Sequence, residues 1–292
     1  MTTVIRIIVL AVAVLFSTVN AQDFQGVATY KTQRKIDIKM DSTQMNSEMH
    51  TQMMEMMKKQ FQKTFNLTFN KEASLYKEEV SLDKPRAAMG GEFQVVMVGN
   101  GGGSDVLYKN TKDNRYADQK DTMGKIFLVK DDFEKIDWKL EAETKYIGEY
   151  QCYKATYTKQ VEITKSLNFS SNSKTDKDDE SEAEIEKEPE MEERTITAWY
   201  TPQIPVNNGP AMYQGLPGLI LEVHDGKLTI ICSKIVINPE DKIEIEEPTK
   251  GKEVNQGKYD EIMDKKAQEM MERYAPRNGR KGGESIEIRI RG

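Results

Sequence analysis

The sequence predicts an α+β protein that is mainly antiparallel β, with one large curved sheet or half-barrel and two amphipathic helices. Apolar and polar residues alternate over short stretches such as 24–34, 64–69 and 125–130, and this alternation is typical of half-buried strands. Turn residues separate the stretches at the spacing of a sandwich, barrel or curved sheet. A helical period occurs at residues 42–63 and again at 259–274. We therefore expect strands to dominate and the helices to be additions to them.

The first 21 residues predict a signal peptide. Arg6 precedes an unbroken apolar run from Ile7 to Phe16, and Val19 and Ala21 suit signal peptidase. The run is too short to span a bilayer, although a retained N-terminal anchor is the alternative. We expect cleavage after Ala21, which leaves residues 22–292 as a single domain that is periplasmic or secreted and is not an integral membrane protein.

After the first strand, at 24–34, residues 42–63 read STQMNSEMHTQMMEMMKKQFQK and place methionines on one helical stripe. Ser42 or Thr43 can cap the start of this helix. The side chains of the stripe are candidate ligand-lining residues, namely Met45, Met49, Met53, Met56, Met57 and Phe61.

Further strands are expected at 114–118, 125–130 and 136–140, and Gly148 is expected to turn a hairpin or kink the sheet. The composition then changes. Residues 170–193 carry a dense run of acids and almost no large apolar side chain. Such a segment buries too little surface to offset its ordering entropy, so we expect a disordered acidic loop between two paired strands of the same domain.

The most densely patterned stretch follows the acidic segment. Residues 195–200 have strand chemistry, and the prolines and glycines of 202–217 exclude a regular helix or central strand. A buried strand resumes at 219–223, and Asp225-Gly226 is a strong hairpin turn before 228–231. We expect the corner at 202–217 to be rigid and exposed.

The hexapeptide Gly-Leu-Pro-Gly-Leu-Ile inside this stretch resembles the signature of the GLPGLI family of secreted Bacteroidota proteins. The residues that carry the resemblance are Tyr150, Cys152, Lys154, Ala155, Ala198, Trp199, Tyr200, Pro205, Gly209, Pro210, Gly215, Leu216, Pro217, Gly218, Leu219 and Ile220. The family has no established biochemical activity, so the resemblance implies no reaction and no cofactor.

The two cysteines, Cys152 and Cys232, each lie inside a predicted strand. In an oxidising compartment an even number makes a disulfide plausible, but two strand cysteines also serve as small buried hydrophobes. There is no Cys-x-x-Cys motif, so a redox role is not expected.

Several functional classes are not expected. The net charge of −6 and the pI near 5.3 argue against nucleic acid, which requires a clustered basic surface. His50 and His224 are the only histidines, and no catalytic constellation is recognisable. We expect no enzyme, and we expect His224 to be a solvated turn residue.

A binding role is preferred instead. By fold-level analogy, a large sheet with a helix inserted after its first strand resembles periplasmic lipoprotein carriers of the LolA and RseB type. The expected ligand is an amphiphile, either lipid or peptide, held on the concave face. The methionine helix would cover or line that face, with apolar wall from Phe127, Trp138, Trp199 and Tyr200.

Two alternatives remain open. An adaptor would use the corner at 202–217 to dock an outer-membrane protein or transport system. A copper protein would use thioethers, which Cu(I) prefers, and the candidate ligands are Met49, Met53, Met54, Met56 and Met57. The same spacing also suits a helix that docks on a sheet.

Overall fold

The computed structural model describes residues 24–34, 62–79, 105–163, 190–226 and 228–274. Several predictions concern residues outside these ranges, so the structure does not address them. They are the signal peptide, residues 42–61 of the methionine helix with all of its candidate ligands, and residues 170–189 of the acidic segment. The predicted end of that helix is wrong, because Lys63 is the first residue of a strand.

The described residues form one sheet of 12 strands and one helix, which confirms the predicted fold class. The elements are β1 (Gln25–Arg34), β2 (Lys63–Asn70), β3 (Ala73–Glu78), β4 (Val106–Asn110), β5 (Arg115–Thr122), β6 (Lys125–Asp132), β7 (Lys139–Ile147), β8 (Tyr150–Ile163), β9 (Glu190–Thr201), β10 (Leu219–Asp225), β11 (Leu228–Ile237), β12 (Lys252–Val254) and α3 (Gln256–Tyr274).

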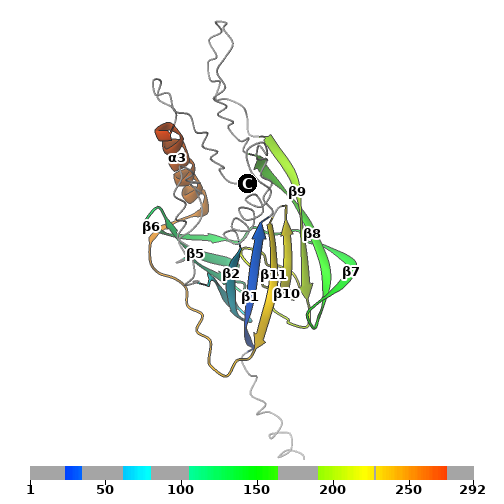
Figure 1. Cartoon of the computed structure of the whole chain (residues 1–292). Coiled ribbons are helices and arrows are strands. Elements are labelled where there is room, and N and C mark those ends of the chain that lie inside the picture. The colour runs from blue at the N-terminus through cyan, green and yellow to red at the C-terminus, as the bar shows by residue number, and fades with distance from the viewer. Residues whose placement is uncertain (1–23, 35–61, 80–104, 164–189, 227, 275–292) are drawn as a thin grey trace, which may run out of the picture.

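The strand order is β12-β6-β5-β4-β3-β2-β1-β11-β10-β9-β8-β7. Neighbours pair antiparallel except β12 and β6, which are parallel. Figure 1 shows that the sheet curls, because β5 and β6 run across the view while β1, β11 and β10 run up it. The first and last strands of the order, β12 and β7, are the edges of this sheet.

Two other predicted boundaries are wrong. Residues 136–138 are not part of a strand, because β7 begins at Lys139 and the indole N–H of Trp138 donates to the backbone oxygen of Gln214 at 2.9 Å instead. Residues 190–193 are not in a loop, because they extend β9 and pair with the end of β8. Paired backbone groups make a strand possible even for a locally acidic sequence.

The corner at 202–217 is not the exposed surface that its prolines and glycines suggest. Ile204 and Val206 are each 2% exposed and Leu216 is 1% exposed, and all three belong to the same core cluster as Phe69 in β2 and Val129 in β6. The segment between β9 and β10, which we call the corner segment (residues 202–218), therefore packs onto the inner face of the curled sheet. Pro202, Gln203, Pro205, Asn207 and Pro217 are exposed, whereas Asn208, Pro210 and Gln214 are buried with the apolar residues.

A second, smaller cluster lies on the other face of β3 to β6. It consists of Ala73, Tyr108, Ala117 and Leu128, and Ile245 packs against it. The chain after β11 crosses this face, and Glu247 is fixed there by Arg115 at 2.7 Å and Lys130 at 3.5 Å.

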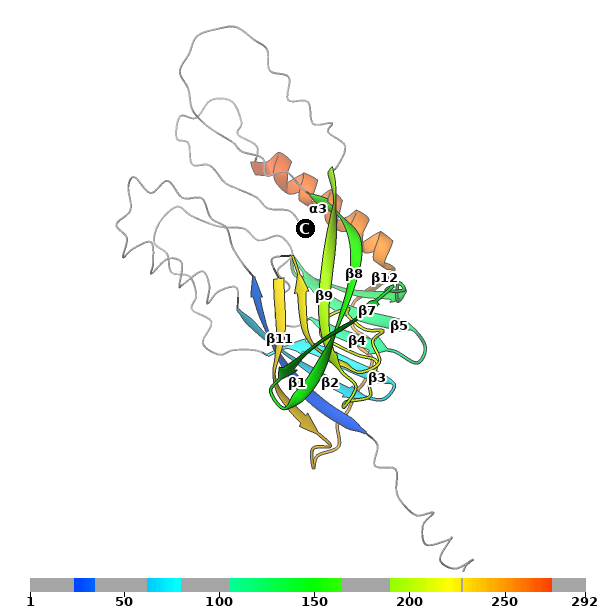
Figure 2. The same cartoon turned by 90° about the vertical axis from the view of Figure 1, so that its right-hand side faces the viewer.

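The helix α3 follows β12 and confirms the second predicted helix. Asn255 caps its start by accepting the backbone N–H of Lys258 at 2.9 Å. Tyr259 is buried and meets Phe127 of β6 edge to face, with ring centroids 5.7 Å apart. Figure 2 shows α3 lying outside the sheet, close to the strands of its β6 end.

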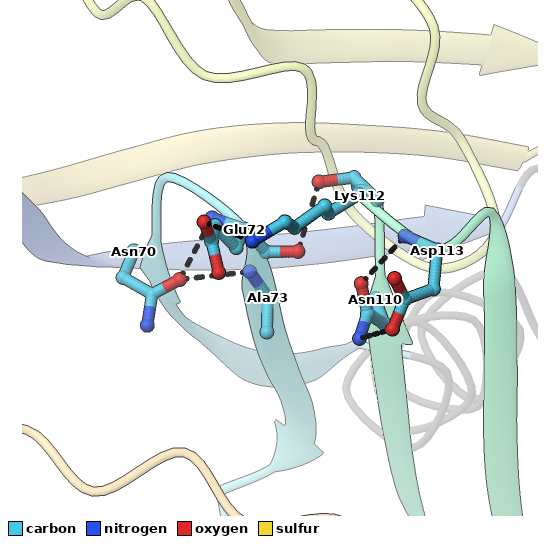
Figure 3. Close-up of polar contacts among 7 residues, drawn as sticks. Asn70, Glu72, Ala73, Asn110, Lys112 and Asp113 are labelled. Atoms are coloured by element: carbon cyan, nitrogen blue, oxygen red, sulfur yellow. Dashed lines mark hydrogen bonds and ion pairs between the residues drawn. The ribbon is translucent and has the colours of Figure 1, made fainter.

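Side chains fix the neighbouring turns that follow β2 and β4 (Figure 3). The Asn70 side-chain oxygen accepts the backbone N–H groups of Glu72 at 2.9 Å and Ala73 at 2.7 Å. Lys112 donates to Glu72 at 2.8 Å, which joins the two turns. These groups are exposed and satisfy one another, so they explain the turns and provide no ligand site.

Candidate functional site

The candidate site is a surface cleft of about 370 Å³ at the start of edge strand β7. One wall is Lys135–Leu140, the segment that enters β7, and the other is Gly215–Pro217 of the corner segment. The volume is within the range of small-ligand pockets, roughly 300 to 1,000 Å³.

Tertiary contacts hold the two walls together. The hydrogen bond from Trp138 to Gln214 ties the first wall to the second, and the Trp138 ring meets Tyr157 of β8 edge to face at 4.7 Å. Gly215 has φ +98 and its backbone N–H donates to the side-chain oxygen of Asn207. A glycine is suited to this left-handed conformation, and it brings the backbone close to the Trp138 ring.

The lining mixes apolar side chains with charged ones, which are Lys135, Asp137 and Lys139. Leu140 is 57% exposed although it is a large apolar residue. Lys135 and Lys139 also line the cleft, and Lys135 pairs with Asp137 at 2.8 Å. Both side chains of that pair are highly exposed, so the pair is weak and readily exchanged. The arrangement suits a ligand that has an apolar group beside an anionic one.

Behind the cleft, Asp225 at the end of β10 fixes the corner segment. Its carboxylate accepts the Tyr213 hydroxyl at 2.6 Å and the Lys159 amine at 2.8 Å, and Arg194 lies 3.5 Å away. Burial alone would raise the pKa of Asp225, but these hydrogen bonds and charges hold it below its ordinary value. The same burial and the neighbouring carboxylate raise the pKa of Tyr213.

Another ionic cluster lies on β10 and its neighbours. Glu222 is 6% exposed and accepts Lys145 at 2.6 Å and His224 at 2.5 Å. The Lys145 amine also lies 4.4 Å from the centre of the Trp199 ring. The sequence predicts a solvated turn residue at His224, but Glu222 and Thr229 hold its two ring nitrogens. The groups satisfy one another, as in a structural cluster.

Sequence reasoning missed Lys109, which lies in β4 and is 0% exposed. Its amine donates to the backbone oxygen of Gly209 at 2.5 Å. Burial lowers the pKa of Lys109 to about 7. The signal in the sequence was its position two residues after Leu107, because alternate residues of a strand share a face. Sequence reasoning passes over such a lysine because long cations are rarely fully buried.

The residues that carry the family resemblance converge in the structure. They occupy the start of β8, the end of β9, the corner segment and the start of β10. The aromatic residues expected to line a concave face divide into buried ones, Phe127 and Tyr200, and half-buried ones, Trp138 and Trp199. Only Trp138 lines the cleft.

The disulfide that the sequence left open is not formed. Cys152 and Cys232 are buried free thiols, which corresponds to the alternative of small hydrophobes. Cys152 is in β8 and Cys232 is in β11, with β9 and β10 between them. Adjacent strands are about 4.8 Å apart, whereas the Cα atoms of bridged cysteines lie within about 7 Å.

The described residues were also compared with the requirements of a metal site and of a membrane-spanning helix. No group of three or more His, Cys, Asp or Glu side chains in these ranges is arranged to hold a metal ion. In the same part of the chain, no helix is both long enough and apolar enough to cross a membrane.

Comparisons with known proteins give a family match and a distant structural likeness. No curated protein matches the chain. Two solved structures of PNGF-II, in space groups C2 and P21, are similar to 83% and 82% of this chain, with 14% and 16% identity and a TM-score of 0.46 each. This chain covers only 33% of the length of either one. Residues 138–222, which run from Trp138 of the cleft through the corner segment to Glu222, match the family model described as "Protein of unknown function (Porph_ging)".

Proposed function

We propose that this protein is a non-enzymatic binding module whose cleft between Lys135–Leu140 and Gly215–Pro217 takes an amphiphile. The ligand would place an apolar group against Leu140 and an anionic group towards Lys139. The observation that carries the proposal is the exposure of Leu140 in a cleft that is also lined by Lys135 and Lys139.

The proposal keeps the amphiphile expected from the sequence but moves its site. A half-barrel carrier would hold the ligand on the inner face of the sheet. In the described residues that face is covered by the corner segment, whose Ile204, Val206 and Leu216 are almost completely buried. The cleft at the edge of the sheet is open and has the mixed lining that an amphiphile needs.

Calorimetric titration of the full mature chain with dodecanoate tests this function. Covering a leucine side chain is worth about 1.5 to 3 kcal/mol, so Leu140→Asp is expected to weaken binding at least about tenfold. Lys139→Glu is expected to weaken dodecanoate and to leave dodecanol unchanged, because only the anion needs the lysine.

Matched controls come from the surface away from the cleft. Ile231 in β11 is 40% exposed and Lys125 in β6 is exposed, so Ile231→Asp and Lys125→Glu should bind dodecanoate as the wild type does. Absence of binding by the wild type, or equal binding by Leu140→Asp and Ile231→Asp, would refute the cleft as the site.

An adaptor is the second candidate, because edge strand β7 also exposes Tyr146, at 71%, in addition to Leu140. The register of β7 against β8 shifts between Leu140 and Thr144, however, and such irregularities discourage the pairing of another strand. An adaptor predicts no dodecanoate binding, together with a co-purifying protein that Tyr146→Asp releases.

Three further expectations from the sequence concern export, family and copper. We propose that the protein is exported through its N-terminal signal peptide and that it is of the GLPGLI type, on the strength of its motif residues between Tyr150 and Ile220. Copper binding by the methionine helix stays an untested alternative, which copper analysis of the purified protein would decide.

A further inference from the structure

Three side-chain hydrogen bonds tie the corner segment to residues that are 12 or more positions away in the sequence. Tyr213 donates to Asp225 at 2.6 Å, and Gln214 accepts from Trp138 at 2.9 Å. The third tie is that from Lys109 to the backbone oxygen of Gly209, at 2.5 Å, which joins residues 100 positions apart in the sequence. This hydrogen bond connects the corner segment to β4, which lies between β3 and β5 and is far from β9 and β10 in the strand order.

Within the described part of the chain, Lys109 has no ion-pair partner, and its amine bonds only the Gly209 backbone oxygen. Ser74 of β3 and Tyr116 of β5 lie opposite it in the sheet, and the Ser74 hydroxyl is buried with no hydrogen-bond partner among the described residues. A charged amine at this place would have a carbonyl oxygen as its acceptor and would lose its hydration, which is costly for an ammonium group.

The ionisable groups on the packed elements are engaged elsewhere. On the face of β3 that Lys109 shares they are Tyr76 and Glu78, and Glu78 pairs with Lys63 at 2.9 Å. On β5 Tyr116 contacts Gln256 at 3.1 Å, and Asp118 pairs with Lys120 at 3.0 Å. On the corner segment the group is Tyr213, which bonds Asp225. Burial alone accounts for the lowered pKa of Lys109, to about 7.

We propose that Lys109 is a protonation-controlled latch on the corner segment. The uncharged amine holds Gly209 against β4 in the closed form, and uptake of a proton favours an open form in which Lys109 reaches water and residues 202–218 lift from the sheet. The proposal does not depend on what the cleft binds.

The direction and size of the effect follow from linkage. Lys109 has its ordinary pKa of 10.5 when it is exposed and about 7 when it is closed in, so the open form binds more protons above pH 7. Opening therefore becomes more favourable as the pH falls through 8 and 7, and it levels off below the lower pKa. Between pH 8 and pH 6 these two values correspond to an increase of about tenfold in the opening equilibrium.

Hydrogen exchange of the full chain at pH 6, 7 and 8, expressed as protection factors, tests the latch. The backbone N–H groups of Leu219 and Ile220 donate to Ile204 and Asn208 of the corner segment, so they report opening directly. Their protection is expected to fall about tenfold from pH 8 to pH 6. The amides of the β1 and β2 ladder are expected to stay constant and serve as the internal control.

Two variants separate the latch from other causes. Lys109→Met keeps the length of the side chain without a titrating group, so its corner amides should show no dependence on pH. Asp113→Asn, on an exposed turn, should behave as the wild type does. Constant corner protection in the wild type between pH 6 and 8 overturns the proposal whether or not Lys109→Met folds. So does a tenfold change that persists in Lys109→Met.

Discussion

At the residue scale, Gly218 decides whether the corner segment can join β10. Its φ is +154, and a Cβ atom placed there would lie 2.2 Å from the backbone oxygen of Thr201. Gly124 also has a positive φ, of +75, but a Cβ atom added to it would meet nothing within 4 Å. A side chain at either glycine would have an unfavourable backbone conformation, and only at Gly218 would it also collide with a neighbouring strand.

We predict that Gly218→Ala lowers the free energy of unfolding by about 3 kcal/mol or more, because the backbone of β9 must move as well. Gly124→Ala should cost only about 1 to 2 kcal/mol, which is the conformational cost alone. Denaturant unfolding of both variants measures the difference. Similar losses in the two variants would show that the close approach of Gly218 to Thr201 can relax.

At the element scale, the corner segment depends on Asp225 being ionised. The folded-state pKa of Asp225 is lowered, so its contribution to stability is present above the pKa of the unfolded chain. It is lost as the pH falls through the folded value. This contribution belongs to the junction of β10, β8 and the corner segment, and not to the sheet as a whole.

We predict that Asp225→Asn unfolds at a lower temperature than the wild type at pH 6, because Lys159 and Tyr213 lose their ionised acceptor. Below about pH 4 the difference between the two proteins should shrink, because the wild-type carboxylate becomes protonated too. Asp137→Asn removes a highly exposed ion pair and should follow the wild-type curve. A constant difference from pH 6 to pH 3 would contradict this role of Asp225.

At the scale of the whole molecule, buried ionisable groups give the protein an optimum pH of stability. The pKa of Lys109 is lowered to about 7, so stability rises with pH from about 7 as the unfolded chain keeps the extra proton. Burial raises the pKa of Cys152 to about 11 and of Cys232 to about 12. Their contribution is lost as the pH rises above the ordinary thiol value, because the unfolded thiols then ionise first.

We predict that the free energy of unfolding rises by about 1 kcal/mol per pH unit near pH 8 and is highest near about pH 9. In Lys109→Met the rise should be absent and only the alkaline decline should remain. Urea unfolding at pH 7, 8, 9 and 10 under reducing conditions measures both curves. A wild-type stability that falls steadily from pH 7 would contradict the lowered pKa of Lys109.

The sequence by itself determined the strands and turns whose cause is local. Alternation predicts β1, and the Asp225-Gly226 pair predicts the β10–β11 hairpin. Gly148 turns β7 into β8 with a φ of +60, as its position indicates. The amphipathic period of residues 259–274 likewise predicts α3, since each of these signals depends only on near neighbours in the chain.

Only the tertiary structure decided what the corner segment does and where the cleft lies. The prolines and glycines predict that residues 202–217 are irregular. They do not predict that Ile204 and Leu216 pack inside a curled sheet. Trp138 leaves the β-period because a partner 76 residues away accepts its indole N–H. The pKa of Lys109 is lowered only because the surrounding strands and the corner segment bury its amine. These outcomes depend on contacts between distant segments, which no local pattern encodes.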